Sequence, residues 1–133
     1  MTLIDTGPLV ALLDRGESEH ARVVETLGTL SGRLVTTWPV LTEAMYLVYR
    51  AGGWTGQRHL WTLVLSERLE VLALTNGLER MHWLMDKYQD TPMGLADASL
   101  VAAAELTGCR RVLTLDSDFR VYRIHDRVEF DLV

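Results

Sequence analysis

The chain of 133 residues has little cysteine, proline or lysine, and it lacks long apolar runs. Its single cysteine, Cys109, excludes an internal disulfide and is typical of proteins in a reducing compartment. No apolar run approaches the roughly 20 residues that a membrane-spanning helix needs. The first residues lack the basic segment of a secretory signal peptide. We therefore expect a cytoplasmic protein with no membrane partner.

Several catalytic motifs are also missing. The sequence contains no Walker loop with its lysine, no G-x-S-x-G, no H-E-x-x-H and no G-x-G-x-x-G. It also has no set of cysteines and histidines with the spacing of metal ligands. These absences argue against nucleotide-binding P-loops, serine hydrolases, zinc proteases and dinucleotide-binding enzymes. Acidic residues remain as the main candidates for chemistry.

The composition is that of a folded protein. Hydrophobic residues make up 48% of the chain, enough for a core, and the length suits one domain over residues 1–133. The formal net charge of −5 argues at first against a nucleic-acid partner. However, all 13 basic residues except Lys87 are arginine, the residue suited to bidentate phosphate contacts. The alternative is that this arginine bias only reflects the base composition of the genome.

One helix stands out in the second half of the chain. Residues 95–106 are nearly all small or apolar, so this helix is predicted to be buried on all sides. Asp97 nevertheless lies in its first turn. The helix dipole favours a carboxylate there by only about 0.3–1 kcal/mol. A buried charge needs a partner or a metal, so we interpret Asp97 as a candidate functional residue.

Short strands alternate with helices along the chain. We expect strands near residues 1–5, 33–37, 69–74, 111–115 and 128–133, with helices between most of them. Strands joined by helical crossovers predict an α/β fold. We expect a central, mainly parallel sheet of four to five strands with helices on both faces.

Some helices can be described in more detail. A helix over residues 18–30 is expected to turn Val24 inward. The sequence Ala51-Gly52-Gly53 predicts a stop between two further helices. Trp54 and Trp61, beside or within the second of them, are interpreted as packing residues of the core or of an interface.

Acidic residues occur where this fold places ligand sites. Asp5 and Asp116 directly follow predicted strands, and Glu43 and Asp97 lie near the starts of predicted helices. Ligands of open α/β sheets bind at the carboxyl ends of the strands. An all-oxygen cluster favours a hard cation such as Mg²⁺ or Mn²⁺. Such an ion can activate water and stabilise charge on a phosphate, so phosphodiester hydrolysis is the reaction that fits best.

Four segments together resemble PIN-domain nucleases. They are Leu3-Ile4-Asp5-Thr6-Gly7-Pro8-Leu9, Thr37-Trp38-Pro39-Val40-Leu41-Thr42-Glu43-Ala44, Leu95-Ala96-Asp97-Ala98-Ser99-Leu100-Val101-Ala102 and Val112-Leu113-Thr114-Leu115-Asp116-Ser117-Asp118-Phe119. Each motif is weak alone, but their order is informative. The length and element order match as well, and the chain is most similar to the VapC-type ribonuclease toxins of prokaryotic toxin–antitoxin pairs.

This resemblance implies a role for individual residues. The family's acidic quartet matches Asp5, Glu43, Asp97 and Asp116. Asp5 and Asp97 would be the principal ligands of Mg²⁺ or Mn²⁺, with Asp116 beside them. Glu43 would help to hold a second ion or position the attacking water. Thr114 matches a hydroxyl that supports the site, and Asp118 either supports it directly or caps the following turn.

The resemblance also implies partners. The protein would cut RNA as an endoribonuclease, form a homodimer, and be neutralised by a small cognate antitoxin. The main alternative is a PIN-like module that binds RNA or protein without appreciable catalysis. A phosphoryl-accepting receiver domain fits less well, because Asp5 is not paired with a second acid and Lys87 does not follow a strand. The four acids could also be unrelated surface charges, although their apolar surroundings argue against this.

Overall fold

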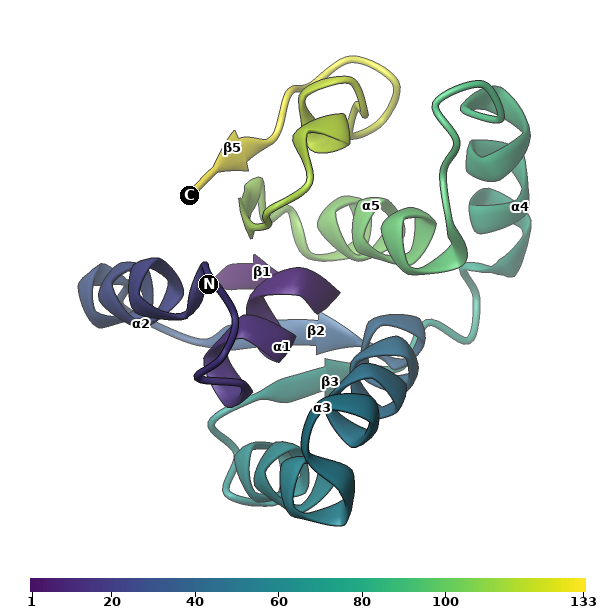
Figure 1. Ribbon diagram of the computed structural model, residues 1–133. Coiled ribbons are helices and arrows are strands. Elements are labelled where there is room, and N and C mark those ends of the chain that lie inside the picture. The colour runs from purple at the N-terminus through teal and green to yellow at the C-terminus, as the bar shows by residue number, and fades with distance from the viewer.

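The computed structural model describes residues 1–133 and contains one five-stranded sheet (Figure 1). The strands are β1 (Thr2–Ile4), β2 (Leu34–Thr37), β3 (Glu70–Leu72), β4 (Arg111–Leu113) and β5 (Asp131–Leu132). Their order across the sheet is β3-β2-β1-β4-β5, and every neighbouring pair is parallel. The predicted parallel sheet is therefore confirmed, although its strands are shorter than expected.

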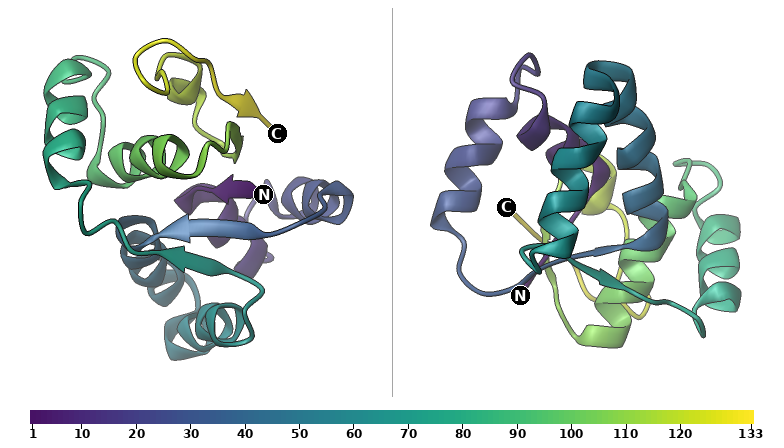
Figure 2. Two further views of the ribbon diagram at one scale, coloured as in Figure 1. Left: turned by 180° about the vertical axis from the view of Figure 1, so that it is seen from behind. Right: turned by 90° about the horizontal axis from the view of Figure 1, so that it is seen from below.

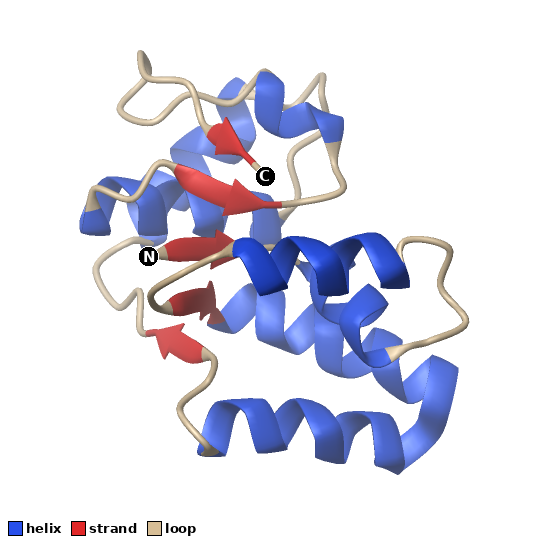
Figure 3. Ribbon diagram, turned by 90° about the vertical axis from the view of Figure 1, so that its left-hand side faces the viewer, coloured by secondary structure: helices blue, strands red, loops and turns tan.

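Helices cover both faces of the sheet, as predicted (Figures 2 and 3). They are α1 (Thr6–Leu13), α2 (His20–Thr29), α3 (Trp38–Leu65), α4 (Leu78–Lys87) and α5 (Leu95–Thr107), with a short 3-10 turn, η1 (Ser117–Arg120). Helices α1, α2 and α3 pack together on one face, and α4 and α5 pack on the other. None of the helices is both long and apolar enough to cross a membrane.

The middle of α5 is part of the core, because its residues there are small or apolar. Every residue from Ala98 to Ala104 is buried, as expected from the sequence. The one polar side chain among them, Ser99, lies 2.6 Å from the Thr37 hydroxyl at the end of β2. It also donates to the Ala96 carbonyl, so no polar atom of Ser99 is left without a partner. This packing holds the first turn of α5 close to the carboxyl end of the sheet.

The prediction for α2 is partly wrong. The helix begins at His20, later than expected, and Val23 rather than Val24 is its buried valine. Val24 is 45% exposed, whereas Val23 is 1% exposed. The difference arises because α2 packs on α1 along a narrow stripe, so only one residue of this valine pair can face inward.

The glycines after Arg50 make a kink rather than a stop. Gly53 has φ 61° and ψ −149°, a conformation that favours glycine, and helical structure resumes directly after it. Just beyond the kink, Gly56 lies against the first half of α3. A Cβ atom built on Gly56 would lie 2.7 Å from the Val48 carbonyl oxygen. The kink therefore folds the second half of α3 back against the first.

Trp54 and Trp61 are not core residues. Their exposed fractions are 54% and 38%, so this part of the prediction is wrong. Both lie beyond the kink, on a half of α3 whose main buried side chain is Leu60. The other part of the interpretation, that they belong to an interface, stays a prediction.

Candidate active site

The parallel sheet gathers several chain segments at one edge. Asp5 directly follows β1, and Asp116 lies three residues beyond the end of β4. Helix α3, which carries Glu43, begins directly after β2. In Figure 1, α5 begins on the side toward which the arrowheads of β1, β2 and β3 point. The first turn of α5, with Asp97, is thus brought to the same edge.

A cavity of about 1150 Å³ opens at this edge. All four predicted acids are among its lining residues, namely Asp5, Glu43, Asp97 and Asp116. Glu17 also lines it, and the lining contains no lysine, arginine or histidine. The cavity therefore has a strongly negative wall with no basic side chain to balance it.

Asp5 is the most buried of the four acids, with 7% of its surface exposed. One carboxylate oxygen, Oδ1, accepts the backbone N–H of Thr6 at 2.7 Å, and Oδ2 accepts the Thr114 hydroxyl at 2.8 Å. Burial raises the pKa of Asp5 to about 6, and the charges of Asp97 and Asp116 add to the rise. The two hydrogen bonds oppose this rise but do not cancel it.

Thr114 links the ends of β1 and β4. While its hydroxyl donates to Asp5, the same oxygen accepts the backbone N–H of Asp116 at 3.0 Å. Asp116 in turn accepts the backbone N–H of Asp118 at 2.9 Å. Asp118 thus stabilises the turn through its backbone N–H. Asp118 itself does not line the cavity.

Asp97 is half-buried in the first turn of α5. Its Oδ2 atom accepts the backbone N–H of Gly94 at 3.1 Å, which closes the start of the helix. The Tyr122 hydroxyl donates to the same oxygen at 3.4 Å. Burial raises the pKa of Asp97 above its ordinary value, and the charges of Asp116 and Glu43 contribute. Asp97 is therefore coupled to acids from two other elements.

Glu43 differs from the three aspartates because it is exposed. It lies in the second turn of α3, and its Oε2 atom accepts the Thr6 hydroxyl at 2.8 Å. Thr6 donates its backbone N–H to Asp5 as well. One threonine at the start of α1 therefore holds two of the acids in place.

The acids fit a hard divalent cation in their chemistry. All four offer oxygen atoms, which Mg²⁺ and Mn²⁺ prefer, and mutual repulsion contributes to the raised pKa of Asp5 and Asp97. No three histidine, cysteine, aspartate or glutamate side chains converge closely enough to form a ready coordination cage. Carboxylates with no cation between them repel one another, and this repulsion favours a larger distance between them than metal coordination requires.

The sequence alone assigns no role at the site to four further residues. Thr6 was part of a motif, but nothing in the sequence predicts that it contacts Glu43. Tyr122 lies in a region without periodicity, and its contact with Asp97 spans 25 residues. Burial raises the pKa of Tyr122 above its ordinary value. Trp38 and Tyr46 line the cavity with 53% and 60% of their surfaces exposed.

Known proteins match this chain both in sequence and in structure. The PIN domain family matches residues 2–124. Ribonuclease VapC26 of Mycobacterium tuberculosis is 33% identical over 115 residues, which cover 86% of this chain and 85% of that protein.

Two solved structures share the fold. The crystal structure of Mycobacterium tuberculosis VapC20, a toxin that cleaves the sarcin–ricin loop, matches with a TM-score of 0.80 at 20% identity. That match covers 91% of this chain and 94% of VapC20. A toxin–antitoxin complex from Klebsiella pneumoniae matches with a TM-score of 0.65 at 21% identity and covers 90% of each chain. With a family match that extends over most of its length and a VapC ribonuclease among its relatives, the chain belongs to the PIN domain family and is of the VapC type.

Proposed function

We propose that this protein is a metal-dependent endoribonuclease, the toxin of a toxin–antitoxin pair, and that residues 1–133 act as one nuclease domain in the cytoplasm. The observation that carries the proposal is the cavity whose wall holds Asp5, Glu43, Asp97 and Asp116 without any basic residue. The relationship to a VapC ribonuclease supports the reaction class.

Asp5, Asp97 and Asp116 are the residues that would hold Mg²⁺ or Mn²⁺. A bound ion of this kind lowers the pKa of water and stabilises the negative charge that develops on a phosphate. Thr114 fixes the relative position of two of these acids, because it donates to Asp5 and accepts from the backbone of Asp116. Asp118 supports the same turn through its backbone N–H.

Glu43 has a different task in this proposal. It is exposed to the cavity, and only Oε2 has a hydrogen-bond donor, the Thr6 hydroxyl. The other oxygen, Oε1, is free to accept a proton from water. Glu43 therefore orients the attacking water and acts as its general base.

RNA is the proposed substrate because aromatic side chains border the acids. Trp38 and Tyr46 are largely exposed where they line the cavity, and unpaired bases stack on such rings. The Arg50 guanidinium lies 6.0 Å from the centre of the Tyr46 ring, so a cation accompanies this surface. Bases would lie on the aromatic rings while the phosphate between them approaches the carboxylates.

An antitoxin and a second copy of the chain are the proposed protein partners. A negative cavity without its own cations suits a basic side chain from a small inhibitory protein. The homodimer is proposed to use the second half of α3, where Trp54 and Trp61 are exposed. The alternative function, binding without catalysis, is an outcome of the following test.

The test is cleavage of a mixed RNA pool by purified protein. We compare the wild type with Asp97→Asn, each with Mn²⁺ and with a chelator. Asp90→Asn is the matched control, because Asp90 is exposed and does not line the cavity. We expect the wild type and Asp90→Asn to cleave RNA with Mn²⁺ but not with the chelator, and Asp97→Asn not to cleave it in either condition. Binding of RNA by the wild type without cleavage would support the binding module instead, and undiminished cleavage by Asp97→Asn would exclude the proposed site.

A further inference from the structure

We propose that Tyr122 is a positioning residue whose phenol holds Asp97 in the orientation that takes a divalent cation. The inference rests on the proposed function, in which Asp97 is a metal ligand. It concerns a residue that the motifs of the sequence do not include. Tyr122 lies beyond η1, in the segment between β4 and β5.

The hydrogen bonds of Asp97 are unevenly divided between its two oxygens. The Gly94 backbone N–H and the Tyr122 hydroxyl both donate to Oδ2, at 3.1 Å and 3.4 Å. No protein group donates to Oδ1, so this oxygen remains available for a ligand in the cavity that Asp97 lines. The phenol contact is long, and hydrogen bonds in active sites often tighten only when the site is loaded.

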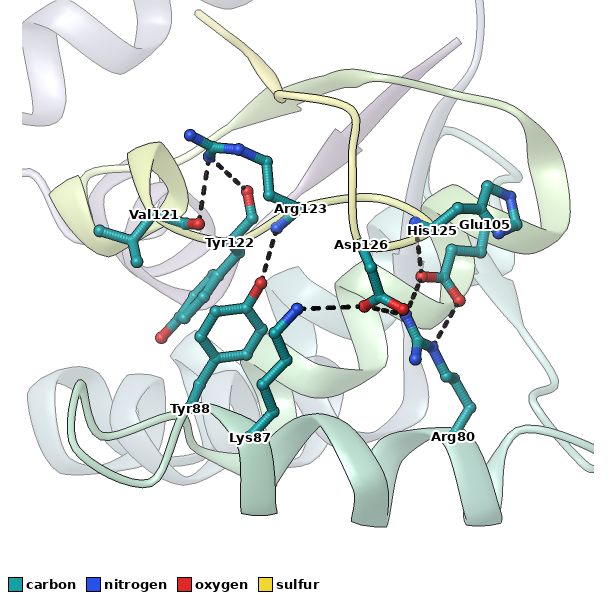
Figure 4. A network of polar contacts seen from close by, with 9 residues as sticks. All are labelled: Arg80, Lys87, Tyr88, Glu105, Val121, Tyr122, Arg123, His125 and Asp126. Atoms are coloured by element: carbon teal, nitrogen blue, oxygen red, sulfur yellow. Dashed lines mark hydrogen bonds and ion pairs between the residues drawn. The ribbon is translucent and has the colours of Figure 1, made fainter.

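The ring of Tyr122 is held firmly by its neighbours. It is completely buried and makes edge-on contacts with Tyr88 and Phe119, with ring centres 5.1 Å apart in both pairs. Figure 4 shows Tyr122 beside Tyr88. A ring packed in this way has little freedom to change its rotamer. The hydroxyl is therefore presented to Asp97 at a fixed place.

The backbone around Tyr122 is held as well. The Arg123 guanidinium donates to the carbonyl oxygens of Arg120, Val121 and Tyr122. Asp126, four residues after Tyr122, pairs with Arg80 of α4 at 2.9 Å. Arg80 also pairs with Glu105 of α5 at 2.8 Å (Figure 4).

Glu105 also accepts the backbone N–H of His125 at 2.9 Å. Lys87, the residue directly before Tyr88, reaches Asp126 at 3.3 Å. These contacts tie the turn after Tyr122 to α4 and α5. The segment that carries the Tyr122 phenol is therefore attached to α5, the helix that carries Asp97.

The arrangement is that of an outer residue that orients a metal ligand. Such residues commonly change metal affinity or activity by about 10–100-fold when they are removed. The Tyr122 hydroxyl is a donor at neutral pH, because an ordinary phenol loses its proton only near pH 10. It can therefore hold the carboxylate of Asp97 without competing for the cation.

The test is the affinity for Mn²⁺, measured by titration calorimetry on the wild type, Tyr122→Phe and Tyr88→Phe. Tyr88→Phe is the matched control, because it removes a second phenol from the same aromatic cluster. The Tyr88 hydroxyl accepts the Arg123 backbone N–H at 3.2 Å and makes no contact with Asp97. Thermal unfolding of all three proteins checks that each is folded.

We expect Tyr122→Phe to bind Mn²⁺ about tenfold more weakly and Tyr88→Phe to bind it like the wild type. Cleavage of RNA by Tyr122→Phe should recover as Mn²⁺ is raised, with an unchanged KM for RNA. Equal Mn²⁺ affinity of Tyr122→Phe and the wild type would overturn the inference. Equal losses in both variants would also overturn it, because packing rather than the phenol would then be responsible. A wild type that binds no Mn²⁺ would instead refute the proposed function, and the inference with it.

Discussion

Asp5 shows what the site costs the fold at the scale of a single residue. It is almost fully buried, and two hydrogen bonds do not compensate for the lost hydration of its charge. Its pKa is about 6 in the folded protein and 3.8 in an ordinary chain. Between these pH values the folded state binds more protons than the unfolded state, so the free energy of unfolding falls as the pH rises.

We predict that Asp5→Asn removes this pH dependence. In the presence of a chelator, the difference in unfolding free energy between Asp5→Asn and the wild type should grow by about 2–3 kcal/mol from pH 4 to pH 7. The variant should be the more stable protein at pH 7, because it has no charge to bury. Urea unfolding at a series of pH values measures this difference. If the difference in unfolding free energy stayed constant with pH, burial would not raise the pKa of the Asp5 carboxyl.

Trp38 allows substrate contact to be separated from catalysis. Stacking of one base on an aromatic ring contributes about 1–3 kcal/mol. Trp38→Ala should therefore raise the KM for RNA about tenfold or more, while the affinity for Mn²⁺ stays unchanged. Trp83→Ala is the control, because Trp83 is also exposed but does not line the cavity. Steady-state cleavage of a short labelled RNA gives the KM for RNA and its dependence on Mn²⁺. Equal effects of the two variants on the KM would exclude base stacking on Trp38.

At the scale of elements, α3 shows how a glycine can permit close packing. A Cβ atom on Gly56 would lie 2.7 Å from the Val48 carbonyl oxygen, whereas a Cβ atom on Gly52 would meet nothing within 4 Å. We predict that Gly56→Ala lowers the free energy of unfolding by about 1–3 kcal/mol, because backbone must move to admit the methyl group. Gly52→Ala should raise it by about 0.5–1 kcal/mol. Urea midpoints of the two variants should move in opposite directions.

Much of the element order could be predicted from the sequence, because it depends on local signals. The largely apolar segment from Leu95 onward predicts a buried helix, and α5 is buried from Ala98 to Ala104, whereas Leu95 and Leu106 at its ends are exposed. The kink at Gly53 could not be predicted in the same way. Paired glycines indicate a break in a helix, but whether the chain then stops or bends depends on the close contact between Gly56 and Val48.

The candidate site, too, could be predicted from the sequence only in part. The positions of Asp5 and Asp116 after strands predict that they share one edge of the sheet, and both line the cavity. The contacts of Tyr122 with Asp97 and of Thr6 with Glu43 depend on how distant segments pack. No local pattern of the sequence carries that information.

At the scale of the whole molecule, exposed apolar side chains gather on α3. Tyr49, Trp54 and Trp61 are each more than a third exposed, and Leu65 is 76% exposed. Aromatic residues of this kind are enriched in protein interfaces. We predict that the protein is a dimer in light scattering at micromolar concentration, and that Trp61→Glu shifts it toward the monomer.

Leu78→Glu is the control for this prediction, because Leu78 is 70% exposed on α4 rather than on α3. It should leave the dimer unchanged. A wild type that is monomeric at these concentrations would contradict the proposed dimer. A dimer that Trp61→Glu leaves intact would place the contact on another surface.

As a whole molecule, the proposed nuclease must cut RNA with the acids of one cavity, and only with a divalent cation. The most direct measurement is a metal jump, in which RNA and protein are mixed without divalent ions and Mn²⁺ is then added. For the wild type we predict intact RNA before the addition and rapid cleavage after it, with no cleavage by Asp116→Asn at either stage. Cleavage before Mn²⁺ is added, or equal cleavage by Asp116→Asn, would contradict the account.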